Sequence, residues 1–166
     1  MSKYCYDFPR PGLTVDMVLL RYPHKLETLL IRRADEPFKN FWAFPGGFVE
    51  VNETAEQAAL RELNEETGLE NVDFVQLFTD TNLNRDPRGW TVSVVYIGFV
   101  NSEIIPLAGD DAADARWFPI NELPALAFDH QLFVEKSIKW IKDRITYCVF
   151  GNEILTEKFF LKDLYN

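Results

Sequence analysis

Residues 47–69, GFVEVNETAEQAALRELNEETGL, decide how the rest of the chain is interpreted. Three glutamates in this stretch, Glu62, Glu65 and Glu66, follow one another at spacings of three and four residues. Such positions are neighbours on one face of a helix, where like charges repel by roughly 0.2–0.5 kcal/mol per pair. A divalent cation such as Mg²⁺ or Mn²⁺ would offset that repulsion, because both ions prefer hard oxygen ligands. The stretch therefore predicts a metal-binding face on a helix.

Local signals bound this helix at both ends. Thr54 followed three residues later by Gln57 forms a capping box, and Gly68 suits the left-handed position that ends a helix. Small or aliphatic residues recur between them at helical spacing: Ala55, Ala58, Ala59 and Leu63. We predict a helix of about 13 residues whose alanine-rich side packs closely against a sheet, with the carboxylates beside it.

Composition limits the class of partner. The chain has 166 residues, of which 47% are apolar, and this fits one globular domain with a substantial core. Its formal net charge of −9 argues against a nucleic-acid groove or an anionic membrane as the main partner, because both would require a basic field. A small anionic substrate fits only where metals and local arginines reverse the sign of the field.

The location of the protein is inferred from what the sequence lacks. The first residues, MSKYCYDFPRPG, have no uninterrupted apolar run like that of a signal peptide, and no stretch of about 18 apolar residues predicts a membrane span. We therefore expect a cytoplasmic protein. Its two cysteines, Cys5 and Cys148, are isolated, which favours free thiols over a disulfide or a zinc site.

Segments on both sides of the helix predict strands of a sheet. Residues 13–20 and 26–33 are β-branched and partly alternating, so they predict a β-hairpin with His24 in its exposed turn. Further strands are predicted at residues 72–78 and 90–100, the latter apolar enough to be covered on both faces.

Other segments complete the expected architecture. Residues 41–47, FWAFPGG, predict a tight turn where the backbone can approach another group closely. A short strand is expected at residues 115–118, and Asp129 can cap a helix over residues 130–145 that covers the sheet. We expect His130, in the first turn of that helix, to be structural or solvent-facing, because no second histidine or cysteine accompanies it.

The stretch that opened this section carries a resemblance to a known family. Its residues satisfy every specified position of the Nudix hydrolase signature, G-x5-E-x7-R-E-U-x-E-E-x-G-U, where U is a bulky aliphatic residue: Gly47, Glu53, Arg61, Glu62, Leu63, Glu65, Glu66, Gly68 and Leu69. A given window matches by chance with a probability on the order of 10⁻⁹ to 10⁻¹⁰. The strand order around this box is also similar to that of a Nudix domain, over roughly residues 10–145.

The resemblance implies a fold, a domain division and a reaction. The fold would be α+β, an α/β/α sandwich with a mixed central β-sheet. We expect this Nudix domain at residues 13–147, between an N-terminal lead-in at residues 1–12 and a C-terminal tail at residues 148–166. The implied reaction is hydrolysis of a nucleoside diphosphate linked to another group, X.

The resemblance also implies roles for individual residues. The groups that would bind Mg²⁺ or Mn²⁺ are Glu62, Glu65, Glu66 and the main-chain carbonyl of Gly46. Arg61 and Glu53 would form the pair that orients them. For Glu65, the roles of metal ligand and general base both stay open, beside a plain ion pair with Arg61. Pyrophosphate cleavage suits such a site, because metals neutralise charge on the departing oxygens and lower the pKa of an attacking water.

Three further segments resemble the branch of the family that contains ADP-ribose pyrophosphatases and regulators of NAD metabolism: GLTVD at 12–16, NRDPRGW at 84–90 and LAFDH at 126–130. Cleavage of ADP-ribose would yield AMP and ribose 5-phosphate. Arg85 and Arg88 have the right chemistry to contact the phosphates or the terminal ribose, although a solvated loop arginine is the alternative for each. The general base could also be Asp110 or Asp111, from a loop outside the box.

Aromatic candidates for stacking on adenine are Tyr6, Phe8, Phe38 and Trp42, each of which could instead belong to the core. Two rival functions share the same box. One is a MutT-like nucleotide-pool sanitiser that hydrolyses oxidised purine triphosphates. The other is the ADP-ribose-sensing domain of a transcriptional regulator, because residues 157–165 resemble a segment that leads into a winged helix. The expected partners are a nucleotide substrate and a second copy in a homodimer, not a membrane or a nucleic acid.

Overall fold

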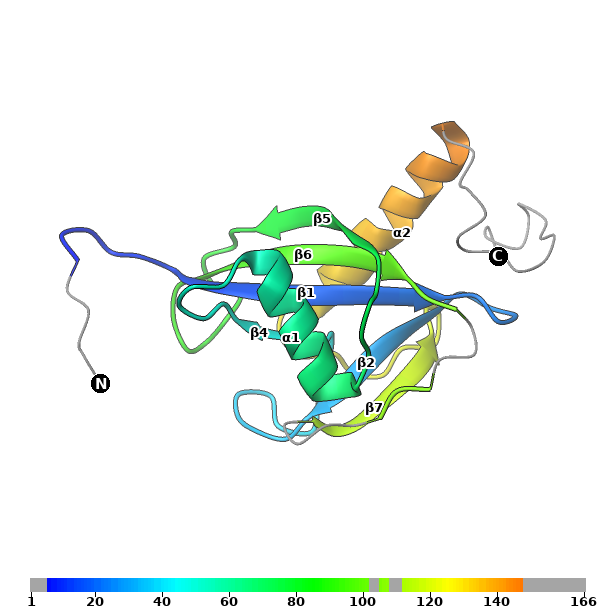
Figure 1. Cartoon of the computed structure of the whole chain (residues 1–166), viewed down its shortest axis with the longest axis horizontal. Coiled ribbons are helices and arrows are strands. Elements are labelled where there is room, and N and C mark those ends of the chain that lie inside the picture. Colours follow the sequence, from blue (N-terminus) through cyan, green and yellow to red (C-terminus); the bar gives the residue numbers. More distant parts are fainter. Residues whose placement is uncertain (1–5, 102–104, 108–111, 148–166) are drawn as a thin grey trace.

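In a computed structural model, which describes residues 6–101, 105–107 and 112–147, the predicted strands form one mixed β-sheet with a helix on each face (Figure 1). The strands are β1 (Gly12–Arg21), β2 (Glu27–Arg33), β3 (Trp42–Ala43), β4 (Gly46–Phe48), β5 (Phe74–Asp80), β6 (Thr91–Phe99) and β7 (Ala112–Pro119). The helices are α1 (Ala55–Thr67) and α2 (His130–Tyr147). This arrangement confirms the predicted α+β sandwich.

β1 is the centre of the sheet. The strand order is β3-β2-β1-β6-β5, with β4 also paired to β1 and β7 also paired to β2. β1 and β6 run parallel, whereas the other pairs are antiparallel. β6 lies between β1 and β5 and is therefore paired on both edges, and its residues are all buried or half-buried, as expected for the predicted strand covered on both faces.

The predicted hairpin of β1 and β2 is confirmed, with His24 exposed in its turn, but the two strands pair only near that turn. Leu20 lies opposite Thr28, whereas earlier in β1 Asp16 lies opposite Gly46 of β4. β2 instead pairs with β3 and β7. β1 and β2 therefore diverge, and residues of both strands and of β3 and β4 line a pocket.

The alternation of side chains along β1 explains why both faces of the sheet are covered. Val15, Met17 and Leu19 belong to the hydrophobic cluster under α1, and Val18 and Leu20 belong to the cluster under α2. Figure 1 shows α1 crossing the near face of the sheet while α2 starts behind it. Side chains on opposite faces of one strand thus serve two separate cores.

The predicted bounds of α1 are confirmed in detail. The capping box is present, because the Gln57 N–H donates to Thr54 Oγ1 and the Thr54 N–H donates to the Gln57 side chain. Gly68 ends the helix in the left-handed region at φ 69°. Ala58 and Ala59 are fully buried against the sheet, so α1 packs as closely as its alanines allow.

Predictions and structure differ mainly at element ends and in the aromatic turn. β7 and α2 are longer than predicted, and β5 begins two residues later, at Phe74 rather than at residue 72. Residues 41–47 contain the short strands β3 and β4, which the Pro45–Gly46 break hid from sequence reasoning. The predicted close approach is confirmed, because a Cβ on Gly46 would lie 2.1 Å from the carbonyl oxygen of Val15. Within the described residues, no helix has the length and apolarity needed to cross a membrane.

Candidate active site

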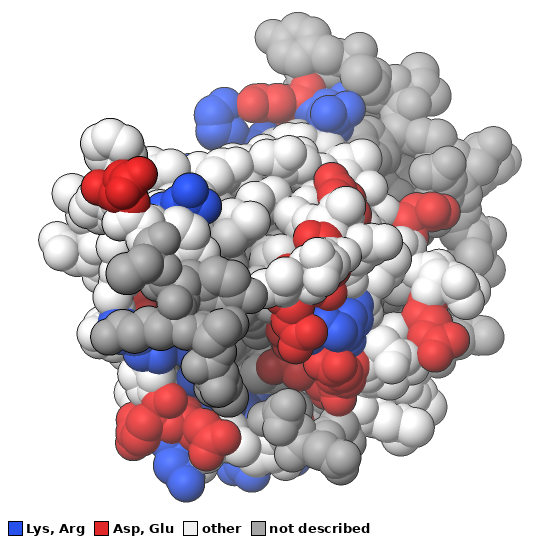
Figure 2. All heavy atoms as spheres, turned by 60° about the vertical axis from the view of Figure 1, so that its left-hand side comes forward, with Lys and Arg blue, Asp and Glu red and all other residues white. Residues whose placement is uncertain are grey.

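Arg61 binds three glutamates, one that precedes α1 and two that lie on it. Its guanidinium donates to Glu53 at 2.7 Å, to Glu62 at 2.8 Å and to Glu65 at 3.0 Å. It also donates to the carbonyl oxygen of Phe48 at 3.1 Å, which ties the cluster to β4. The hydrogen bonds to Glu53 and Glu62 raise the pKa of Arg61 far above its ordinary value despite partial burial. Figure 2 shows acidic side chains gathered around a basic one on one face of the molecule.

Glu66 lies apart from this cluster, on the buried side of α1. Its carboxylate accepts a hydrogen bond of 2.8 Å from the N–H of Gly46 and is only 8% exposed. Burial raises the pKa of Glu66 to about 8, with further increases from the charges of Glu62 and Asp16. Burial also raises the pKa of Glu62, against the opposing effect of Arg61. Two desolvated carboxyl groups therefore face the same glycine turn.

This turn fits a hard divalent cation by the chemistry of its donors. A Cβ on Gly47 would lie 2.2 Å from Glu62 Oε1, so the carboxylate rests directly on the glycine backbone. Among the described residues no group of three acidic, histidine or cysteine side chains is placed to hold a metal ion, and Glu62 and Glu65 are bound to Arg61. Burial is the main cause of the raised pKa of Glu66, and a bound cation would stabilise the charged form of this carboxylate against burial and against the charges of Glu62 and Asp16. The donor types present therefore fit the expected metal, and a bound metal would draw Glu62 and Glu65 away from Arg61.

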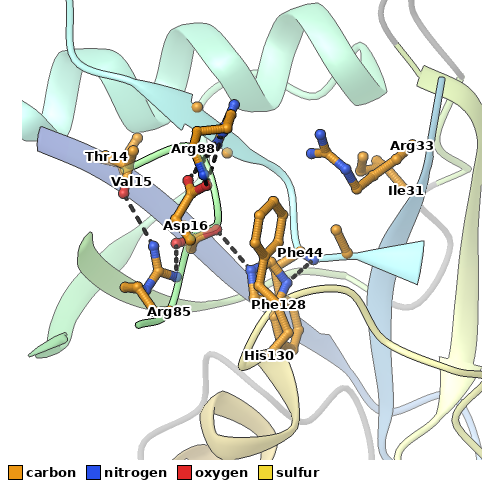
Figure 3. A pocket seen from close by; sticks show the side chains of 14 residues that line it. Thr14, Val15, Asp16, Ile31, Arg33, Phe44, Arg85, Arg88, Phe128 and His130 are labelled. Carbon is orange, nitrogen blue, oxygen red and sulfur yellow. Dashed lines mark hydrogen bonds and ion pairs between the residues drawn. The ribbon is translucent and has the colours of Figure 1, made fainter. Parts of the chain in front are cut away.

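A pocket of about 380 Å³ opens beside the glycine turn (Figure 3). This figure includes the space that is open to solvent as well as the hollow itself. Its charged lining consists of three arginines and two aspartates: Arg33, Arg85, Arg88, Asp16 and Asp86. Three positive and two negative charges leave a local surplus of one positive charge in a chain of net charge −9. An anionic group is therefore favoured here, in contrast to the rest of the molecule.

Arg85 is neither a solvated loop residue nor a free phosphate ligand. Its side chain is 4% exposed and forms ion pairs with Asp129 at 3.1 Å and with Asp16 at 3.4 Å. Its guanidinium also lies 5.5 Å from the ring centre of Phe133. The predicted substrate contact by Arg85 would compete with two carboxylates that already bind it. The main role that the structure shows for Arg85 is to join the loop, β1 and α2.

Arg88 lies at the rim of the pocket, where its guanidinium forms a paired contact with buried Asp86, the shortest distance being 2.7 Å. Burial raises the pKa of Asp86, but the hydrogen bonds from Arg88 outweigh burial and hold that pKa below its ordinary value. The charge of Arg88 is thus oriented by Asp86 and partly neutralised. Its side chain is still 42% exposed and can reach a ligand at the pocket mouth.

Arg33, which sequence reasoning missed, is the cation of the pocket that no described carboxylate neutralises by an ion pair. Its Nε donates to the carbonyl oxygen of Pro37 at 2.8 Å. Burial and the nearby charge of Arg88 both lower the pKa of Arg33. Both guanidinium groups lie near the ring of Phe128, at 4.9 Å for Arg33 and 5.7 Å for Arg88 (Figure 3). Two like charges held together in this way favour a bound anion.

Phe128 has a strained backbone, with φ at 51°, a region that bulky residues rarely adopt. Its ring is packed from behind by Phe38, whose φ is 64° and whose ring centre lies 4.8 Å away. Phe38 was predicted as a stacking platform for adenine, but in the structure it supports the pocket wall that Phe128 forms. Strain of this kind is often concentrated at functional sites.

The remaining predicted site residues are three aromatic candidates for stacking on adenine and two aspartates proposed as the general base. Phe8 and Tyr6 are exposed in the lead-in, at 79% and 52%, and do not line the pocket. Trp42 packs edge-on against Phe118, with ring centres 4.7 Å apart. The candidate bases Asp110 and Asp111 lie outside the described residues.

Two residues that line the pocket, Asp16 and His130, were not predicted as site residues. Asp16 is the lone charged residue in the apolar strand LTVDMVLL, which is a signal that sequence inspection could have used. His130 is structural, as predicted, but it is 2% exposed rather than solvent-facing. Burial raises the pKa of Asp16, yet His130, Arg85 and Ser93 together outweigh burial and leave that pKa below its ordinary value.

Comparison with known proteins agrees with this geometry. The model of the NUDIX domain matches residues 10–141, so the chain belongs to the Nudix family. It is 42% identical over 131 residues to the ADP-ribose pyrophosphatase of Methanocaldococcus jannaschii, which covers 78% of this chain and 75% of that protein. Family and relatives together place the chain among the Nudix pyrophosphohydrolases.

A regulator and solved structures are similar as well. The ADPR responsive transcriptional repressor NtrR of Acinetobacter baylyi is 30% identical over 165 residues, which are 96% of this chain but 66% of the repressor. The NUDIX domain of Shewanella oneidensis NrtR complexed with ADP ribose superposes with a TM-score of 0.72 at 36% identity, covering 82% of this chain and 94% of that one. A MutT/nudix family protein from Enterococcus faecalis gives a TM-score of 0.84 at 34% identity, covering 98% of this chain and 74% of that one.

Proposed function

We propose that this protein hydrolyses the pyrophosphate bond of ADP-ribose to AMP and ribose 5-phosphate with the help of Mg²⁺ or Mn²⁺. The observation that carries the proposal is that the carboxylate-lined glycine turn opens directly onto a pocket containing Arg33 and Arg88. Acidic groups for a cation and basic groups for an anion thus lie side by side. The similarity to an ADP-ribose pyrophosphatase supports the choice of substrate.

The residues that would hold the cation are those of the glycine turn and of α1: Glu62, Glu65, Glu66 and the carbonyl of Gly46. When bound, the cation supplies charge neutralisation at the phosphate oxygens and a lower pKa for the attacking water. Arg61 orients Glu62 and Glu65, and Glu53 holds Arg61. Glu65 is the freest of the three, with a side chain 48% exposed, which supports either a ligand or a general base. Asp110 and Asp111 remain proposed alternatives for the base.

The basic side of the pocket would bind the substrate's phosphates. Arg33 can donate to phosphate oxygens without breaking an ion pair to any described carboxylate, whereas Arg88 is presented by its contact with Asp86. Phe128 holds both guanidinium groups against its ring. Guanidinium groups donate to phosphate in a fixed fork, so this pair would orient the pyrophosphate relative to the glycine turn.

A second candidate is a sensor that binds ADP-ribose without hydrolysing it. It is favoured by the similarity to an ADPR responsive repressor over 96% of this chain and to a regulator domain that was solved with ADP ribose. The intact signature, with all four acidic positions occupied by glutamate, favours the enzyme. A pool sanitiser remains the third candidate, supported by a 30% identity to the Putative 8-oxo-dGTP diphosphatase of Bacillus subtilis over 59% of this chain.

One assay separates the three candidates. The protein is incubated with Mg²⁺ and either ADP-ribose or an oxidised deoxyguanosine triphosphate, and the products are identified by chromatography. AMP with ribose 5-phosphate is the expected result. Release of pyrophosphate from the triphosphate alone would refute the proposal in favour of the sanitiser. Tight binding of ADP-ribose with no product from either nucleotide would point to the sensor.

A further inference from the structure

His130 makes a hydrogen bond with each of its ring nitrogens, although it is buried among aromatic rings. The N–H of Phe44 donates to His130 Nδ1 at 3.0 Å, and His130 Nε2 lies 3.3 Å from Asp16 Oδ1 (Figure 3). The rings of Phe44, Phe128 and Phe133 lie within 5.5 Å of the imidazole, measured between ring centres. A phenylalanine would fill this aromatic space equally well, so packing alone does not explain a histidine here.

The direction of these hydrogen bonds follows from the donors. Because a backbone N–H points at Nδ1, that nitrogen accepts, and the ring proton is on Nε2, where it is donated to Asp16. Asp16 is held in turn by Ser93 of β6 and by Arg85 of the loop that carries Arg88. A continuous polar chain thus runs from that loop through Asp16 and His130 to the backbone of Phe44.

Phe44 is the residue from which the glycine turn begins. Pro45 has no N–H, and its carbonyl accepts from the Met17 N–H at 2.8 Å. The next N–H, that of Gly46, is bound to Glu66. His130 therefore anchors the turn two residues before Gly46, and β1 and α1 anchor the rest. Since Asp16 lies opposite Gly46 in the pairing of β1 and β4, the anchor and the turn share one strand register.

We propose that His130 is a positioning residue: oriented by Asp16, it fixes the Phe44–Gly46 backbone and thereby the carbonyl and carboxylate geometry that binds the divalent cation. This inference rests on the metal-dependent site proposed above. Groups that orient metal ligands in other proteins change metal affinity or activity by roughly 10–100-fold when removed, which sets the expected size of the effect.

The test replaces one end of the histidine at a time. His130→Asn puts an amide oxygen near the position of Nδ1 and keeps an acceptor for the Phe44 N–H, whereas His130→Gln keeps a donor near Nε2 and His130→Phe keeps only the ring. Mn²⁺ affinity is measured by calorimetry, kcat and KM for ADP-ribose by product formation, and folding by thermal unfolding. The matched control is His24→Phe, which alters an exposed histidine in the β1–β2 turn. Loss of Mn²⁺ binding in Glu66→Gln confirms which site is being measured.

The expected result is that His130→Phe and His130→Gln weaken Mn²⁺ binding and lower kcat by about 10-fold or more, with KM changed less than about 3-fold. His130→Asn retains most of both properties, and His24→Phe behaves as the wild type. Wild-type Mn²⁺ affinity and kcat in a folded His130→Phe variant would overturn the inference, and so would equal losses in the Asn and Gln variants.

If His130→Phe fails to fold, the comparison of Mn²⁺ affinity and kcat between His130→Asn and His130→Gln still tests the inference. A wild-type protein that binds Mn²⁺ but hydrolyses neither nucleotide would overturn the proposed hydrolysis while the Mn²⁺ affinities still test the role of His130. A wild-type protein without Mn²⁺ affinity would overturn both.

Discussion

Arg61 and Arg85 each bind more than one carboxylate, but in opposite surroundings. The carboxylate partners of Arg61 lie within eight residues of it in the chain, and its side chain is 26% exposed. The partners of Arg85, Asp16 and Asp129, are 69 and 44 residues away, and its side chain is 4% exposed. One cluster is assembled locally on a helix surface, and the other joins three distant parts of the fold.

The difference in solvent contact decides what each cluster does. In the Arg61 cluster Glu53 and Glu62 are 16% exposed, but Glu65 is 48% exposed, so the pair of Arg61 with Glu65 is the one that can exchange partners at little cost when a cation binds. Removing one member of a buried ion pair costs roughly 3–5 kcal/mol, because the remaining charge has no solvent. The Arg61 cluster is therefore suited to chemistry and the Arg85 cluster to holding the pocket together. Four predictions test this division and the site around it.

The largest effect is expected for Glu66→Gln. The variant keeps an oxygen that accepts from the Gly46 N–H but removes the charge that would bind the cation. We expect kcat for ADP-ribose to fall by about 10³-fold or more, about 4 kcal/mol of barrier, with the fold intact. Product formation and circular dichroism measure the two properties. A rate near that of the wild type would refute the metal assignment.

Arg85→Met addresses the buried cluster directly. It leaves Asp16 and Asp129 without their shared cation, so we expect a loss of about 3–5 kcal/mol in the free energy of unfolding. The matched variant Arg61→Met should lose less than Arg85→Met, because the side chain of Arg61 is 26% exposed and that of Arg85 is 4% exposed. Urea unfolding of both variants without added metal gives the comparison. Similar losses in the two would contradict the division of roles.

Arg33→Met tests the cation that has no described carboxylate partner. A charge-assisted hydrogen bond contributes about 1.5–3 kcal/mol, so we expect KM for ADP-ribose to rise by about 10–100-fold. The stability of the protein should change little. Arg116→Met removes one positive charge from an exposed position on β7 and serves as the control. An unchanged KM would remove Arg33 from the substrate site.

The smallest expected effect is a change of stability with pH, which should have opposite signs for Glu53 in the Arg61 cluster and Asp129 in the Arg85 cluster. The hydrogen bond from Arg61 lowers the pKa of Glu53 below 4.5, so its stabilising contribution is present above that value and is lost as pH falls through the lowered pKa. Burial raises the pKa of Asp129 above 3.8; Arg85 opposes this shift and Asp80 adds to it. The contribution of Asp129 is therefore full below 3.8 and is lost as pH rises through the raised pKa.

Relative to the wild type, Glu53→Gln should thus lose more stability near pH 6 than near pH 3, and Asp129→Asn should lose more near pH 3 than near pH 6. Urea unfolding across this range measures both trends. Parallel trends in the two variants would show that the clusters do not differ in solvation as described.

Local sequence signals predicted α1 from its capping box to Gly68 and the β1–β2 hairpin, and the family resemblance implied the contact of Arg61 with Glu53. All of these depend on residues close together in the chain, for which spacing fixes proximity. The same reasoning did not find Arg33, and it assigned Arg85 to substrate rather than to Asp16 and Asp129. The expected homodimer, the domain bounds and the roles of Asp110 and Asp111 stay predictions.

The sequence alone determined the family and its reaction class, because residues 47–69 are a continuous helical signature whose side chains meet by local geometry. Only the tertiary structure decided which of the three pocket arginines are already bound to carboxylates. Arg33, Arg85 and Arg88 are alike as residues, but the parallel pairing of β1 with β6 and the docking of α2 give Arg85 the carboxylates of buried Asp16 and half-buried Asp129. Long-range pairing and desolvation set the role of each arginine, and neither is encoded by spacing along the chain.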